Sequence, residues 1–125
     1  MNNPVGWFEI YVSDMARAKI FYETVLNIRL GELVAPNDQS IQMKIFPSDM
    51  DKYGATGALV KMEGFPVGGN SVLVYFSCDD CSVEESRIEL AGGKVEKSKF
   101  SIGEYGFISL AIDTEGNIFG LHSLK

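Results

Sequence analysis

The feature that most constrains the fold of this chain is an internal duplication. Two halves of the sequence have the same expected order of elements, and matching residues lie 66 positions apart, or about 61 apart near the end of each half. Two copies of one supersecondary unit are expected to pack around a shared core. A chain of 125 residues is long enough for one such core, so we expect a single domain over residues 1–125. The matched segments are Phe8–Val12 with Val74–Cys78, Asp14 with Asp80, and Ile41–Phe46 with Phe107–Ile112.

Each copy is predicted to contain a strand, a helix and three further strands. Alternating apolar residues indicate strands, Asp14 is an N-cap signal, and Asn27 and the pair Gly92–Gly93 are helix stop signals. The sequence therefore predicts an α+β fold of two βαβββ modules in a pseudo-twofold arrangement. We place module 1 at about 5–62, a linker at about 63–70 and module 2 at about 71–125. The expected strands are 7–12, 28–34, 39–46, 58–62, 71–78, 94–100, 105–112 and 117–124, with a turn at 35–40 and helices at 15–26 and 79–93.

Composition and charge exclude several function classes. The net charge of -6 and the 11 scattered Lys and Arg residues argue against binding to nucleic acid, which depends on clustered positive charge. No apolar run reaches the roughly 18 residues that a membrane span requires, and the first residues lack the pattern of a secretory signal. We therefore expect no membrane partner and a cytoplasmic location.

The two cysteines are predicted to be reduced and unreactive. Cys78 and Cys81 have the spacing of a redox motif, but the two Asp residues between them disfavour a thiolate. A zinc site would require more ligands than these two thiols and the single histidine, His122, supply.

The first strand presents an unusual polar and aromatic face. Its alternation places Trp7, Glu9 and Tyr11 on one side, while Phe8, Ile10 and Val12 face the helix. In the second copy, Leu73, Tyr75 and Ser77 occupy the equivalent outer face, and Val74, Phe76 and Cys78 belong to the core. A mixed aromatic, apolar and polar lining is typical of a small-molecule cleft. For Tyr11 and Tyr75, packing at a module or subunit interface is the alternative.

Three segments resemble the vicinal-oxygen-chelate superfamily, which includes glyoxalase I, extradiol dioxygenases, and fosfomycin- and bleomycin-resistance proteins. They read "NPVGWFEIYVSDMARAKIFYETVLN", "VYFSCDDCSVEESRIELAGGKV" and "DTEGNIFGLHS". More closely, the chain resembles the bacterial group described as predicted enzymes related to lactoylglutathione lyase. The resemblance implies a glyoxalase-like fold, in which the modules form a curved mixed sheet around a cleft, and a homodimer.

The resemblance also implies metal ligands at four positions that this chain has changed. The ligand positions of metal-dependent members fall on Trp7, on Leu73 or Val72, on Leu59 or Val60, and on Gly120. None of these side chains binds a metal, so we expect no metal and no other cofactor. Glu9 and His122 each lie two residues from an expected ligand, and this pair is the alternative route to a weakly bound divalent metal.

Two small-molecule functions remain open from the sequence, and a third possibility is an interaction protein with no small ligand, whose aromatic face is buried in a homodimer. The first is a glyoxalase/bleomycin-resistance-like protein that binds a planar or hydrophobic small molecule through Trp7, Tyr11, Leu73, Tyr75 and Gly120. The alternative is a lyase or isomerase related to lactoylglutathione lyase.

The enzyme hypothesis assigns the chemistry to two residues. Glu9 would be the general base, with its pKa raised in a partly dry cleft, and His122 would be a further acid or base. The competing interpretations are that Glu9 sits at a solvent-exposed edge or pairs with Lys44 or Lys61, and that His122 is a hydrogen-bonded structural residue. Gly120 is expected to mark the close approach of another group, with Trp7 as the candidate.

Overall fold

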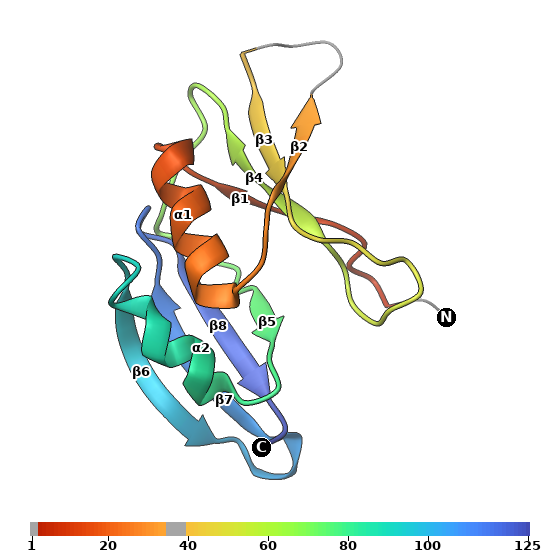
Figure 1. Ribbon diagram of the computed structural model, residues 1–125, viewed down its shortest axis with the longest axis vertical. Coiled ribbons are helices and arrows are strands. Elements are labelled where there is room, and N and C mark those ends of the chain that lie inside the picture. The colour runs from red at the N-terminus through yellow and green to blue at the C-terminus, as the bar shows by residue number, and fades with distance from the viewer. Residues whose placement is uncertain (1–2, 35–39) are drawn as a thin grey trace.

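The computed structural model describes residues 3–34 and 40–125, and it contains the two predicted modules (Figure 1). The elements of module 1 are β1 (Phe8–Tyr11), α1 (Met15–Leu26), β2 (Gly31–Val34), β3 (Gln42–Ile45) and β4 (Gly57–Lys61). Those of module 2 are β5 (Tyr75–Ser77), α2 (Cys81–Ile88), β6 (Lys94–Ser101), β7 (Phe107–Ile112) and β8 (Ile118–Ser123), with a 3-10 turn at Gly103–Tyr105.

Each module forms a four-stranded mixed sheet with the same topology. The strand orders are β1-β4-β3-β2 and β5-β8-β7-β6. In both sheets the first and last strands of the module pair in parallel, and the remaining pairs are antiparallel. The duplicated order therefore confirms the predicted α+β fold.

Several strands are shorter than the sequence predicts. β1 begins at Phe8, which is where its pairing with Gly57 of β4 begins, so Trp7 precedes the strand. β5 begins at Tyr75, where pairing with Gly120 of β8 begins, and this leaves Leu73 before the strand. Alternation of side chains cannot locate the last backbone pair, which depends on the neighbouring strand. The turn predicted at 35–40 lies, except for Ser40, outside the described residues.

Local capping explains where the helices begin and where α1 ends. A side-chain oxygen of Asp14 accepts a hydrogen bond from the backbone N–H of Arg17 at 3.0 Å. Asn27 ends α1 in the left-handed conformation with φ 54°, which a short polar side chain tolerates. At the second helix, Asp80 accepts from the N–H of Ser82 at 3.0 Å.

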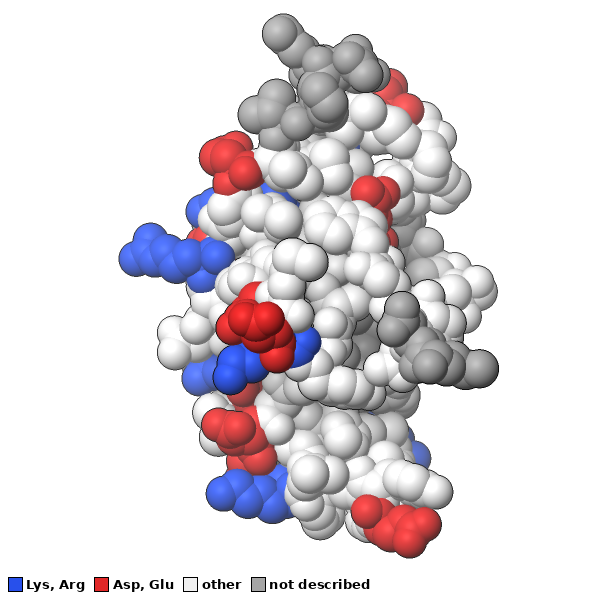
Figure 2. All heavy atoms as spheres, turned by 90° about the vertical axis from the view of Figure 1, so that its right-hand side faces the viewer, with Lys and Arg blue, Asp and Glu red and all other residues white. Residues whose placement is uncertain are grey.

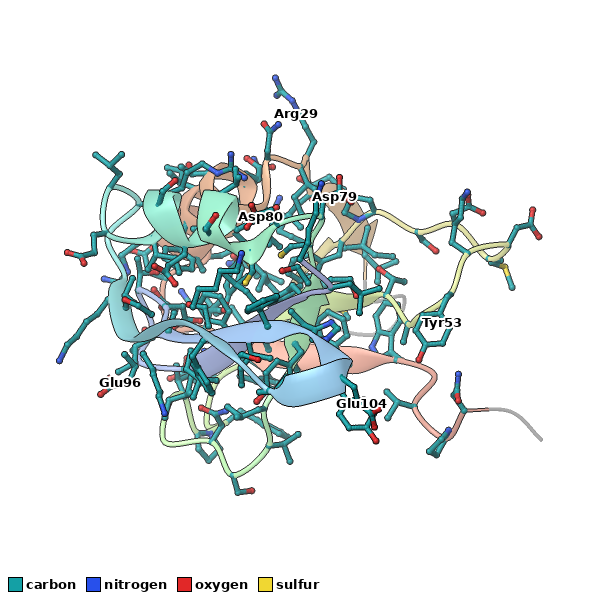
Figure 3. All side chains as sticks on the ribbon, turned by 90° about the horizontal axis from the view of Figure 1, so that it is seen from below. Arg29, Tyr53, Asp79, Asp80, Glu96 and Glu104 are labelled. Carbon is teal, nitrogen blue, oxygen red and sulfur yellow. The ribbon has the colours of Figure 1, made fainter. Side chains whose placement is uncertain are left out.

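The core lies between the two helices and the sheets. Figure 3 shows both helices on one side of the strands, and the linker between β4 and β5 on the other. Phe21 and Tyr22 of α1 are fully buried and pack edge to face at 4.9 Å, and both contact Phe119 of β8. Ile10 and Val12 are buried as predicted, and Phe8, Phe76 and Cys78 pack against the core.

No helix among the described residues is both long enough and apolar enough to span a bilayer.

Candidate functional site

Trp7, Glu9 and Tyr11 form a hydrogen-bonded row along the first strand, which we call the Glu9 row. The indole Nε1 of Trp7 donates to one carboxylate oxygen of Glu9 at 3.2 Å, and the hydroxyl of Tyr11 donates to the other at 2.7 Å. Glu9 is solvent-exposed rather than enclosed in a dry cleft. Its described hydrogen-bond partners, Trp7 and Tyr11, are uncharged donors. Lys44, one of the partners predicted for Glu9, instead forms an ion pair with Glu32.

Tyr11 holds its end of the row as a protonated phenol. Its ring stacks on Phe65 of the linker, with centroids 4.5 Å apart and planes inclined by 13°. Burial and the neighbouring Glu9 raise the pKa of Tyr11 to about 12. The hydroxyl therefore remains a hydrogen-bond donor to Glu9 at neutral pH.

A cavity of about 490 Å³, here called the seam cavity, lies between the modules, where β1, the linker and the start of β8 meet. Its lining includes the buried side chains of Tyr22 and Phe119, here called its floor, and the more exposed Glu9 and Tyr11, here called its rim. Among the described residues of the lining, Glu9 is the only acidic or basic one. The other lining residues are Phe8, Ile10, Pro66, Gly68, Gly69, Asn70, Val72, Val74, Asn117 and Ile118. Val74, predicted as core, thus lies at this cavity.

Trp7 lines a second cavity, the loop cavity, with Gly6 and residues 47–50 and 52–56. Its volume is about 660 Å³, and its walls come mostly from the loop between β3 and β4, which projects to the right in Figure 1. Met50 and Tyr53 on this loop are almost fully exposed, and Tyr53 is labelled in Figure 3. Figure 2 shows that mostly uncharged residues cover this side of the molecule. The Glu9 row therefore spans two cavities, with Trp7 at one and the other two residues at the seam.

Gly120 allows the close approach of an aromatic ring, but the ring belongs to Tyr75 and not to Trp7. A Cβ added at Gly120 would lie 2.3 Å from two ring carbons of Tyr75. The two residues are register partners in the parallel pair of β5 and β8, so their side chains share one face of the sheet.

The residues at the expected metal positions do not fit a metal. Leu59 is fully buried in the core, and the ring of Tyr75 packs over Gly120, where relatives are expected to have a carboxylate. No group of three His, Cys, Asp or Glu side chains suitable for a metal occurs in the described parts of the chain. We therefore derive no chemistry through a metal.

We predict that Gly120→Ala destabilises the fold by about 1–2 kcal/mol, because the new methyl group must displace the Tyr75 ring. Tyr75→Ala removes the ring that the new methyl group would meet. Adding Gly120→Ala to the Tyr75→Ala variant should therefore cost much less free energy of unfolding than Gly120→Ala costs in the unaltered protein. Chemical denaturation of the four members of this cycle measures the coupling. A purely additive cycle would contradict the assigned contact.

His122 lies away from both cavities. Its Nε2 lies 2.7 Å from the carbonyl oxygen of Tyr105, and because a carbonyl can only accept, this nitrogen carries the proton. Ile118, which lines the seam cavity, lies on the same face of β8 as His122. The two residues are four positions apart, which corresponds to about 13 Å along the strand. Neither cavity is lined by both Glu9 and His122.

Both cysteines are free. Burial, together with the nearby carboxylate of Glu84, raises the pKa of the Cys78 thiol to about 12. The thiol is therefore protonated at neutral pH, and the causes are burial and Glu84 rather than the adjacent Asp residues.

Sequence reasoning missed a buried polar network that joins the modules, here called the inter-module network. It contains Asp113, Glu115 and Asn117 of the turn between β7 and β8. Glu115 accepts from the backbone N–H groups of Ser13 and Asp14, each at 2.9 Å, and from the guanidinium of Arg17 at 2.6 Å. The sequence "DTEG" places two acidic residues, Asp113 and Glu115, in the turn. Which helix their side chains reach depends on tertiary packing and could not be predicted from the sequence.

The network also fixes the end of β1 and the linker beside the seam cavity. The amide nitrogen of Asn117 donates to the carbonyl of Tyr11 at 3.0 Å, and its oxygen accepts from the N–H of Gly68 at 3.0 Å. Asp113 accepts from the hydroxyl of buried Tyr22 at 2.5 Å. Burial and the negative charge of Asp113 hold the pKa of Tyr22 well above its ordinary value.

Comparison with known proteins places the fold. No protein-family model and no curated protein matches the sequence. Among solved structures, glyoxalase I from Zea mays aligns at 21% identity with a TM-score of 0.74, over 96% of this chain and 46% of that one. An antibiotic binding protein from a Streptomyces species aligns at 23% identity, with a TM-score of 0.68, over 99% of this chain and 98% of that one.

A glyoxalase/bleomycin resistance protein/dioxygenase family enzyme from Burkholderia phytofirmans aligns at 15% identity, with a TM-score of 0.69, over 96% of this chain and 98% of that one. This chain therefore spans about half the length of maize glyoxalase I and nearly all of the other two. Sequence identities this low support a shared fold but do not show a shared activity. The chain has the glyoxalase-like fold of paired βαβββ modules, in agreement with its resemblance to the vicinal-oxygen-chelate superfamily.

Proposed function

We propose that the protein binds a small molecule with a flat, apolar body in the seam cavity. The observation that carries this proposal is the lining of the cavity: apolar and aromatic side chains that reach the core, with two amides and one carboxylate beside them. Small-molecule sites typically occupy about 300–1,000 Å³ and combine an apolar wall with a few placed polar groups. The volume of about 490 Å³ lies in that range.

The walls of the seam cavity are held in place by hydrogen bonds, which supports a binding role. Asn70 of the linker donates to the carbonyl of Ile118 at 3.0 Å and accepts from its N–H at 2.9 Å. Asn117 ties the linker to the end of β1 through its bonds with Gly68 and Tyr11. A preorganised wall loses little freedom when a ligand binds, so more of the contact energy contributes to affinity.

The fold neighbours give further support, since one of them is described as an antibiotic binding protein and has nearly the same length. Both oxygens of Glu9 already accept hydrogen bonds from Trp7 and Tyr11. This arrangement favours a role for Glu9 in orienting and attracting a ligand over the abstraction of a proton. We also propose a homodimer, in which a second copy covers exposed side chains such as Tyr75 and Tyr53.

Filling the seam cavity is expected to weaken binding. Val72 lines the cavity but is 71% exposed, so Val72→Trp should add bulk at the mouth without disturbing the core. We predict that this variant lowers the affinity for flat aromatic probes such as acridine by about tenfold or more, because the indole occupies ligand volume. Isothermal titration calorimetry measures the change.

The matched control is Val83→Trp, which adds the same side chain at a half-exposed position of α2 outside the seam cavity. It should leave the affinity unchanged. Equal affinities for the unaltered protein and both variants, or no binding of any flat probe to the unaltered protein, would overturn the proposed function.

A further inference from the structure

The charge distribution around the seam cavity narrows the class of ligand. In the described part of the chain, Glu9 is the one acidic residue of its lining, and no Lys, Arg or His lines it. The remaining polar side chains of the lining are amides and tyrosine hydroxyls, which are neutral. An anionic ligand would therefore find no cationic side chain among the described residues of the lining and would meet a carboxylate at the rim.

The carboxylate of Glu9 is fixed in position without being neutralised. Its two hydrogen bonds come from the indole of Trp7 and the hydroxyl of Tyr11, both uncharged donors. No Lys or Arg side chain lies within ion-pair distance of Glu9 in residues 3–34 and 40–125. The carboxylate thus has no cationic partner among the described residues, and the two donors determine where its oxygens lie.

Aromatic faces beside this charge suit the same ligand. Tyr11 lines the seam cavity, and its ring is held against Phe65 by stacking at 4.5 Å. Rings of this kind attract cations through their negative faces and stack on flat aromatic bodies. The raised pKa of Tyr11 keeps its hydroxyl protonated, so no second negative charge competes with Glu9 for the ligand.

We propose that the seam cavity selects an organic cation with a flat aromatic body, whose positive charge is placed against the Glu9 carboxylate. This inference rests on the proposed function, because it names the ligand class of the same cavity. The apolar floor of Tyr22 and Phe119 takes the aromatic body. The rim carboxylate then distinguishes a cation from a neutral molecule of the same shape, because opposite charges at contact distance attract each other even near the protein surface.

A matched set of probes tests the charge separately from the shape. N-methylacridinium is a permanent cation, acridine is neutral at mildly alkaline pH, and acridine-9-carboxylate is an anion with the same ring system. We expect calorimetric titration to give an affinity about tenfold higher for the cation than for the neutral probe, and weaker binding still for the anion.

Glu9→Gln is the variant that tests the assignment, because the amide keeps the size of the side chain and one acceptor for Trp7 or Tyr11. It should lower the affinity for N-methylacridinium about tenfold more than it lowers the affinity for acridine, because only the cation loses an opposite charge. Glu96→Gln is the control for net charge, since Glu96 is exposed on β6, away from the cavity (Figure 3). It should change neither affinity.

The outcomes separate the two proposals. If acridine and N-methylacridinium bind equally well and both lose affinity in Val72→Trp, the charge selection is wrong while the binding function stands. If Glu96→Gln lowers the affinity for N-methylacridinium as much as Glu9→Gln does, the preference for the cation comes from overall charge, and the inference is also wrong. If no probe binds to the unaltered protein, both proposals fail.

Discussion

Replacing Glu115 with alanine is expected to lower the free energy of unfolding by about 2–4 kcal/mol. The Glu115 side chain is completely buried, and it accepts hydrogen bonds from two backbone N–H groups at the start of α1 and from Arg17. Its removal leaves these donors without their anionic partner. Arg17 is about half exposed and can turn to water, which keeps the loss within this range.

The contribution of Glu115 is also expected to depend on pH. Burial alone would raise the pKa of Glu115, but hydrogen bonds from Arg17, Asp14, Ser13 and Thr114 outweigh it and lower the pKa from 4.5 to about 2. A lowered pKa in the folded state means that the stabilisation is complete above pH 4.5 and is lost as the pH falls toward 2. The difference in unfolding free energy between the unaltered protein and Glu115→Gln should therefore shrink across this window.

Urea denaturation at a series of pH values measures both effects. Glu104→Ala is the matched control, because Glu104 is exposed in the 3-10 turn and lies outside the inter-module network (Figure 3). That variant should stay within about 0.5 kcal/mol of the unaltered protein. A loss of the same small size for Glu115→Ala, or a gap to Glu115→Gln that does not change with pH, would contradict the role assigned to the network.

Gly57→Ala is the second substitution expected to have a large effect, with a loss of about 2–4 kcal/mol in unfolding free energy. Gly57 pairs with Phe8 where β4 and β1 meet, and a Cβ added at Gly57 would lie 2.1 Å from the carbonyl oxygen of Phe8. A side chain could rotate away from such a contact, but a backbone oxygen moves only if the strand moves. The Glu9 row would be displaced together with β1.

Gly6→Ala provides the comparison for this substitution. Gly6 lies two residues before Phe8, and an added Cβ there would meet nothing within 4 Å. Thermal unfolding should show a lower midpoint for Gly57→Ala and almost none of that change for Gly6→Ala. If the two variants unfold together, then β1 and β4 do not approach as closely as the structure shows.

The fold could be predicted from the sequence because its signals are local and repeated. Asp14 and Asn27 mark the ends of α1 as expected, and the alternation around Ile10 correctly assigned the buried face of β1. The hydrogen-bonded Glu9 row follows from the same alternation. Each of these features depends on residues close together in the chain, so the local pattern contains the information.

The composition of the cavities could not be predicted in the same way. The seam cavity combines β1 with residues of the linker and with Ile118, and the contact between Asn117 and Tyr11 spans 106 positions. The sequence placed Trp7 against Gly120, whereas the parallel register of β5 and β8 brings Tyr75 there. Strand register between distant segments is set by packing, which single-residue patterns do not encode.

The two helix starts, although related by the duplication, are anchored differently. Asp80 at the start of α2 pairs with Lys99 of its own module at 2.9 Å, whereas the start of α1 depends on Glu115, about a hundred residues further along the chain. Cutting the chain within the linker would thus affect the halves unequally. The later fragment would keep the anchor of its helix, and the earlier fragment would lose the acid that holds the first turn of α1. The acid that holds the first turn of α1 thus comes from module 2, whereas the ion pair at the start of α2 lies within its own module.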